Sequence, residues 1–165
     1  MFFRGLVFLV LGSVAATAAS RDDIDFATGI SLPPEVWMAL EKSNDYSVEA
    51  RINPYYLRGD FDGDGTPETA VLVKHRTSGK KGMALVSGSG KIRIIGAGKS
   101  IDEDLDNFDW MDAWYVFAKG DVGQGATDEA PPKLKGDAIA AIKTESSSGL
   151  IWWDGKRFRW YQQGD

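Results

Sequence analysis

The amino-acid sequence predicts an α+β fold, with one N-terminal amphipathic helix packed on a mostly antiparallel sheet of about six to eight strands. Three observations support this fold class. A helix signature precedes residue 44, whereas from Ser47 onward the apolar runs are short, alternate with polar residues and end at glycine. A turn signal near the C-terminus joins the last two runs as a β-hairpin. The 165 residues, with 12% aromatic side chains, suffice for one packed domain.

The first 18 residues have the pattern of a secretory signal peptide. Arg4 supplies a positive charge, an apolar run extends from Leu6 to Val14, and Ala16 and Ala18 form an A-x-A pattern. The A-x-A pattern indicates cleavage after Ala18 or Ala19. The apolar run is shorter than the roughly 20 residues that a membrane-spanning helix needs, so we do not expect it to be a membrane anchor. The sequence therefore predicts a secreted protein, periplasmic or extracellular, with no membrane anchor after processing.

The predicted helix follows a polar lead-in over residues 19–30. Ser31 can cap the helix, and two prolines follow where the N–H groups of a first turn are unbonded in any case. One face of the helix then carries apolar side chains, those of Val36, Trp37 and Leu40. We expect a helix over about residues 34–43, with this face covering the sheet, in a single α+β domain over residues 31–165.

Six short apolar segments after the helix are predicted strands. They are Thr69–His75, Met83–Ser87, Lys91–Ile95, Ala113–Ala118, Ala138–Lys143 and Leu150–Trp153. Asp154 and Gly155 follow the last of them and precede another aromatic-rich segment, which predicts a hairpin with a type I′ turn. Trp152 and Trp153 are adjacent, so they must point to opposite faces of their strand. We expect the helix or a loop to cover both faces, and the alternative is that one tryptophan is exposed and available to a ligand.

One segment, Gly59–Glu68, has the spacing of a metal-binding loop. Its carboxylates stand at loop positions 1, 3, 5 and 9, and Gly65 at position 6 permits the positive φ of a sharp bend. Such carboxylates can converge on one hard cation, and Ca²⁺ suits them because it takes six to eight oxygens in flexible geometry. The predicted ligands are Asp60, Asp62, Asp64, the carbonyl of Thr66, and Glu68. Position 12 is Val71 instead of the glutamate of an EF-hand, and the alternative is an acidic turn without an ion.

The segment GDFDGDGTPETAVLV resembles the calcium loop of FG-GAP repeats, the integrin-α-type DxDxDGxxD/E motif, in which the loop leads directly into a strand. The resemblance implies side-chain ligands at positions 1, 3, 5 and 9 and a main-chain ligand at position 7. A broader resemblance, through YYLRGDFDGDG, IIGAGKSI, DNFDWMDAW and LKGDAIAAIKTESSSGLIWWDGKRFRWYQQGD, is to a family of small secreted bacterial proteins of unassigned activity. It implies a compact domain in the cell envelope and no catalytic residue.

A second acidic segment spans residues 102–112. Asp102, Asp104 and Asp106 repeat the alternation, but Trp110 stands at position 9, where the metal loop has a carboxylate. We interpret this segment as a solvated acidic loop, with a second calcium site as the alternative.

The sequence lacks the residues that several classes of function require. The chain has 24 acidic and 19 basic residues with no clustered basic face, so we expect no nucleic-acid partner. Its one histidine, His75, stands between Lys74 and Arg76, and no GxSxG motif occurs, so we expect no enzyme. The sequence favours an exported, non-enzymatic, calcium-stabilised binding module of the bacterial envelope, with an envelope protein as partner. The alternative is an inhibitor or immunity-type protein against a periplasmic or cell-wall enzyme, and a hydrolase using acidic residues ranks third.

Overall fold

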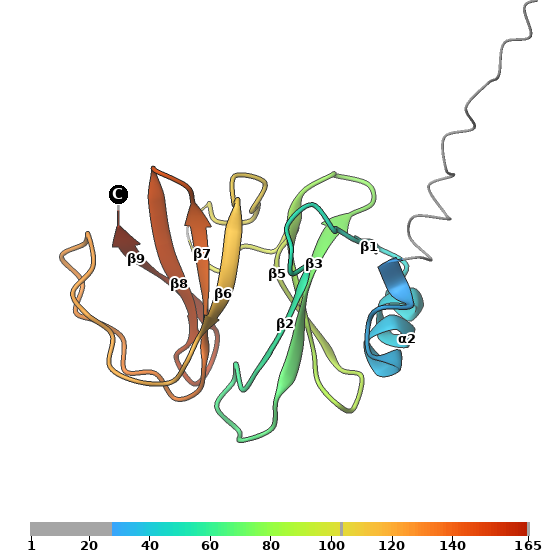
Figure 1. Cartoon of the computed structure of the whole chain (residues 1–165), viewed down its shortest axis with the longest axis horizontal. Coiled ribbons are helices and arrows are strands. Elements are labelled where there is room, and N and C mark those ends of the chain that lie inside the picture. The colour runs from blue at the N-terminus through green and yellow to red at the C-terminus, as the bar shows by residue number, and fades with distance from the viewer. Residues whose placement is uncertain (1–27, 103, 165) are drawn as a thin grey trace, which may run out of the picture.

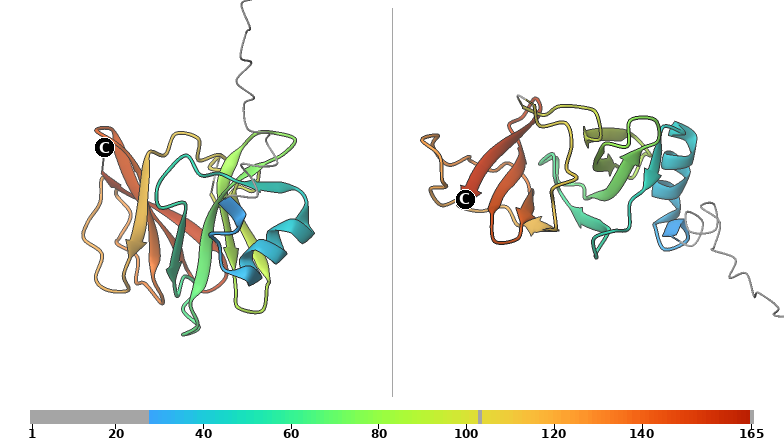
Figure 2. Two further views of the ribbon diagram at one scale, coloured as in Figure 1. Left: turned by 45° about the vertical axis from the view of Figure 1, so that its right-hand side comes forward. Right: turned by 90° about the horizontal axis from the view of Figure 1, so that it is seen from above.

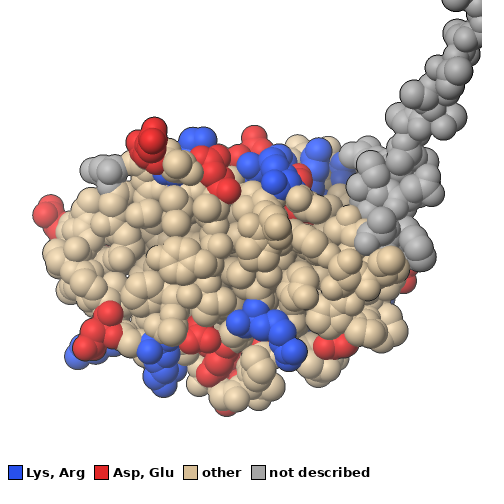
Figure 3. All heavy atoms as spheres, in the orientation of Figure 1, with Lys and Arg blue, Asp and Glu red and all other residues tan. Residues whose placement is uncertain are grey.

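The computed structural model describes residues 28–102 and 104–164, so the predicted signal peptide lies outside the described residues. Within this part of the chain the fold is mostly β, with nine strands in two antiparallel sheets and a helix against one outer face (Figure 1). None of the helices in the described residues is long and apolar enough to cross a membrane. Acidic and basic side chains both occur along the upper and lower borders of the face shown in Figure 3.

The first sheet is built around one long strand. Its members are β1 (Tyr46–Val48), β2 (Tyr56–Gly59), β3 (Glu68–His75), β4 (Lys81–Val86) and β5 (Ile92–Gly96). One edge of β3 pairs with β2 in its first half and with β1 in its second half, while β4 pairs with the other edge and β5 with β4. The helix α2 (Pro34–Ser43) lies on the outer side of this sheet (Figure 2).

The second sheet is an antiparallel meander. It contains β6 (Ala113–Phe117), β7 (Ala138–Lys143), β8 (Ser147–Trp153) and β9 (Phe158–Gly164), in that order. Each strand follows its neighbour in sequence, so short connections suffice except between β6 and β7. That longer connection, residues 118–137, runs along the outside of the sheet (Figure 1).

Alternating side chains on the strands form the layers of the core. On β3, Ala70 and Leu72 belong to the cluster between the two sheets, whereas Val71 and Val73 belong to the cluster beneath helix α2. Because both faces of the first sheet are covered, β3 is buried from Glu68 to Val73. From one side of the molecule to the other, the layers are therefore helix α2, the first sheet, the second sheet and the connection over residues 118–137.

The outer connection covers the far face of the second sheet. Leu134 and Val122 pack there against a buried cluster that includes Leu150, and Trp152 joins the same cluster. Trp153 packs instead against the cluster between the sheets. The prediction that the two tryptophans point to opposite faces, with both faces covered, is confirmed, and the cover over Trp152 is a loop.

The predicted fold is borne out in part: a helix packs on antiparallel strands, but the fold is mostly β and the strands divide into two sheets instead of one. The helix occurs at Pro34–Ser43 as predicted but is not N-terminal, and residues 28–102 and 104–164 form nine strands instead of the expected six to eight. Antiparallel pairing and the C-terminal hairpin are confirmed. The physical reason for the error is that side-chain alternation shows which residues share a face, but it does not show whether successive strands pair or face each other across a core.

The turn of the C-terminal hairpin differs from the predicted type I′. Trp153 pairs with Phe158, which leaves a four-residue loop, and among the described residues of this loop only Gly155 has a positive φ, of 103°. The carboxylate of Asp154 accepts hydrogen bonds from the N–H groups of Lys156 and Arg157, at 2.7 and 2.9 Å. A carboxylate that accepts N–H groups two and three residues further along the chain forms an Asx-type turn, which stabilises this longer loop.

The Asp154→Ala variant is expected to melt a few degrees below the wild type at neutral pH, because two turn N–H groups lose their acceptor. The hydrogen bonds from Arg157 and Lys156 lower the pKa of Asp154 below its ordinary value of 3.8. Its stabilising contribution is therefore present above that ordinary value and is lost as the pH falls through the lowered pKa. Thermal melts from neutral to strongly acidic pH check this, and a difference between variant and wild type that persists in acid would contradict it.

Candidate metal site

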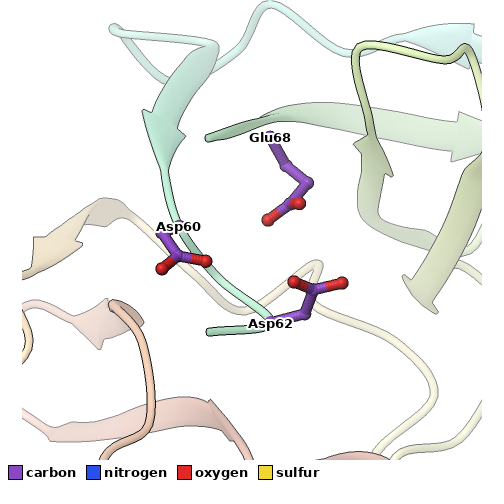
Figure 4. A group of neighbouring side chains, drawn as sticks. All are labelled: Asp60, Asp62 and Glu68. Atoms are coloured by element: carbon purple, nitrogen blue, oxygen red, sulfur yellow. The ribbon is translucent and has the colours of Figure 1, made fainter. Parts of the chain in front are cut away.

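Three acidic side chains converge at one end of the first sheet. Asp60 and Asp62 lie in the loop after β2, and Glu68 is the first residue of β3. One carboxylate oxygen from each residue lies within 4.8 Å of the corresponding oxygens of the other two (Figure 4). This group of three acidic residues could hold a metal ion.

The loop reaches this shape through its glycines and one buried aromatic ring. Gly63 and Gly65 have φ values of 73° and 88°, which side-chain-bearing residues adopt rarely. Between the two aspartates, Phe61 is completely buried in the core between the sheets, and its N–H donates to Glu68 Oε2 at 3.0 Å. The Gly65 N–H donates to Asp60 Oδ2 at 3.1 Å. Core packing and main-chain hydrogen bonds thus hold the carboxylates together despite their mutual repulsion.

Two oxygens at the site have no hydrogen-bond partner among the residues that the structure describes. Asp60 Oδ1 and Asp62 Oδ1 are buried and accept no hydrogen bond within the described part of the chain. Glu68 is only 4% exposed, and its pKa is raised mainly by burial and further by the nearby charges of the three loop aspartates, against the lowering effect of the Phe61 N–H. Buried, unpaired carboxylate oxygens are costly, and a cation would neutralise their charge and complete their bonding.

Arg93 lies beside the acidic group. Its Nη1 is 2.6 Å from Asp62 Oδ2, and its guanidinium carbon lies 5.1 Å from the centre of the Trp153 ring, a cation–π geometry. Together with Asp62, Asp64 and Glu68, it lines a pocket of about 220 Å³. The sequence gives no sign of Arg93 at this site, because Arg93 lies on β5, far from the loop in sequence, and no local motif connects the two.

Asp137 connects the metal loop to the second sheet. Its Oδ2 accepts the N–H of Asp60 at 3.0 Å, and its own N–H donates to the carbonyl of Asp60 at 2.7 Å. Its Oδ1 accepts the N–H of Lys119 at 2.9 Å. Because Asp137 immediately precedes β7, the acidic group lies where the two sheets are tied together. No sequence motif connects Asp137 to the loop either.

The remaining predicted ligands have a different placement. Asp64 lines the same pocket but is outside the group of three, and its Oδ1 accepts the N–H of Thr66 at 2.7 Å. Both residues are exposed. The structure thus brings together three of the five predicted ligands, and the participation of Asp64 and the Thr66 carbonyl stays a prediction.

Carboxylates of the second acidic segment pair with separate basic side chains instead of converging on one point. Asp109 lies 2.7 Å from Lys81 Nζ and Asp112 lies 3.1 Å from Lys143 Nζ, while Asp106 pairs with Lys80. Within the described residues of 102–112, no three carboxylates approach closely enough to hold a metal ion. This arrangement supports the interpretation as a solvated acidic loop.

The comparisons with known proteins found no matching family model, no matching curated protein and no matching solved structure. The resemblance to FG-GAP calcium loops therefore rests on the loop residues themselves.

Proposed function

We propose that this protein is an exported, non-enzymatic binding module of the bacterial envelope whose fold is stabilised by one calcium ion. The observation that carries the proposal is the convergence of Asp60, Asp62 and Glu68 with two buried carboxylate oxygens that lack hydrogen-bond partners in the described chain. These ligands offer only oxygen atoms, which favours a hard cation. Asp64 and the Thr66 carbonyl would supply additional oxygens from the same loop, and Ca²⁺ accepts such flexible, carboxylate-rich coordination more readily than Mg²⁺ does.

The position of the site supports a structural role for the ion. The loop carries Phe61 into the core and is bonded through Asp60 to Asp137, at the start of the second sheet. An ion that fixes this loop would also fix the adjoining ends of both sheets. The chain's one histidine, His75, lies at the opposite end of β3 and is engaged by the Ser78 hydroxyl at 2.9 Å, so the acidic group has no imidazole base beside it.

Calcium at about 100 times its Kd is expected to raise the melting temperature by roughly 5–10 °C relative to EDTA, because the ion binds only the folded loop. The Asp62→Asn variant should lose most of this rise, whereas Asp128→Asn, which changes an exposed aspartate outside the site, should keep it. Mg²⁺ at the same concentration should give a smaller rise. Equal melting temperatures in EDTA and in calcium would refute the proposed ion.

A further inference from the structure

A second and larger pocket lies beside β9, the edge strand of the second sheet. Its volume is about 970 Å³, and it is lined by residues 100–102, 105 and 110, by residues 127 and 129 of the β6–β7 connection, and by side chains of the β8–β9 hairpin. Ligand-binding pockets commonly have volumes of about 300–1,000 Å³. None of its lining residues belongs to the candidate metal site, so it requires a separate explanation.

Two tryptophans form a fixed aromatic surface in this pocket. The ring centres of Trp110 and Trp160 are 5.9 Å apart with the rings at 86° to each other, an edge-to-face contact. The Trp160 ring lies directly over Gly149, where a Cβ atom would come within 2.1 Å of it. Its Nε1 donates to Gln162 Oε1 at 3.0 Å. The Trp160 ring is therefore held by the protein before any ligand arrives, while part of it remains exposed.

Polar and charged groups surround the aromatic surface. Asp102 accepts the main-chain N–H of Trp160 at 2.7 Å, and its other oxygen lies 3.1 Å from Arg159 Nε, so the carboxylate and the guanidinium form an ion pair. Arg157 and Glu129 are exposed and carry opposite charges. The described lining thus holds two arginines and two carboxylates, which gives it hydrogen-bonding capacity without net charge.

We propose that this pocket binds a neutral oligosaccharide. A sugar ring has an apolar C–H face that can stack on an indole, and hydroxyl groups that both donate and accept hydrogen bonds. An apolar ligand would cover the exposed Arg157 and Glu129 without offering them hydrogen bonds, and an ionic ligand would meet a lining without net charge. The inference rests on the proposed function, because it names the ligand class of that binding module.

Tryptophan fluorescence and calorimetric titrations of the protein with chitotetraose, cellotetraose and maltotetraose test the proposal. At least one of these sugars should bind saturably, and Trp110→Ala and Arg157→Ala should each weaken binding about tenfold. Arg157 is exposed, so its variant should stay folded even where Trp110→Ala does not. Tyr115→Ala, which removes a 50% exposed aromatic ring from β6 at the far edge of the sheet, should bind as the wild type does.

Absence of binding for all three sugars, or binding unchanged in Arg157→Ala and Trp110→Ala, would overturn the oligosaccharide proposal. Tighter binding of an acidic oligogalacturonide than of any neutral sugar would overturn it as well. Melting curves in EDTA and calcium on the same samples separate the two proposals. A calcium-dependent rise without sugar binding rejects only the pocket, and sugar binding without a calcium-dependent rise rejects only the ion.

Discussion

Replacing Phe61 by alanine is expected to lower the free energy of unfolding by about 3–5 kcal/mol, the range found for deeply buried phenylalanines. The Phe61 side chain is completely buried between the sheets, and the residue stands between two of the three converging carboxylates. Its loss would leave a cavity and release the loop that places Asp60 and Asp62. Urea unfolding gives the free energy, and thermal melts should show a drop of roughly 6–20 °C.

Two matched variants separate core packing from general perturbation in this experiment. Phe61→Leu keeps an apolar side chain in the core, so it should retain most of the stability and the response to calcium. Tyr115→Ala removes an exposed aromatic ring and should change the free energy of unfolding by at most about 0.5 kcal/mol. A Phe61→Ala variant within 1 kcal/mol of the wild type would show that the loop does not depend on this anchor.

The Gly136→Ala variant is expected to lose about 1–3 kcal/mol of stability and most of the response to calcium. A Cβ atom at this position would lie 2.1 Å from the Asp60 carbonyl oxygen and 2.7 Å from the Gly63 nitrogen. Both are main-chain atoms, so no side-chain rotation can relieve the overlap. The segment would have to move away from the metal loop, which breaks the main-chain hydrogen bond from Asp137 to Asp60.

Gly88→Ala is the matched control for this substitution, because a Cβ atom there meets nothing within 4 Å. The melting temperature of this variant should be close to that of the wild type, and calcium should raise it by the same amount. Melting curves of both variants in EDTA and in calcium make the comparison. A Gly136→Ala protein with wild-type melting curves would contradict the view that close packing between the two sheets shapes the candidate metal site.

The acidic loop was predictable because its information is local. Alternating carboxylates and glycines at fixed offsets indicated a tightly bent loop, and the structure brings Asp60, Asp62 and Glu68 together within it. Arg93 and Asp137 could not be predicted in the same way. They reach the loop from β5 and from the start of β7, and only strand pairing and sheet packing determine that approach.

The C-terminal hairpin likewise has one feature that the sequence predicts correctly and one that it does not. The aromatic-rich strands around Asp154 and Gly155 correctly indicated antiparallel partners. The predicted turn type was wrong because the Asp154 carboxylate accepts hydrogen bonds from two N–H groups of a longer loop. A sequence of this composition is compatible with such a loop as well as with a type I′ turn.

The sequence by itself determined the features that depend on neighbouring residues: the helix at 34–43, most strand positions, and the spacing of the acidic loop. The tertiary structure alone decided that the strands form two packed sheets, that Arg93 and Asp137 join the acidic loop, and that Trp110 and Trp160 meet at one pocket. The physical reason is that backbone preferences and side-chain alternation act over a few residues, whereas contacts between sheets depend on how all buried faces are satisfied at once.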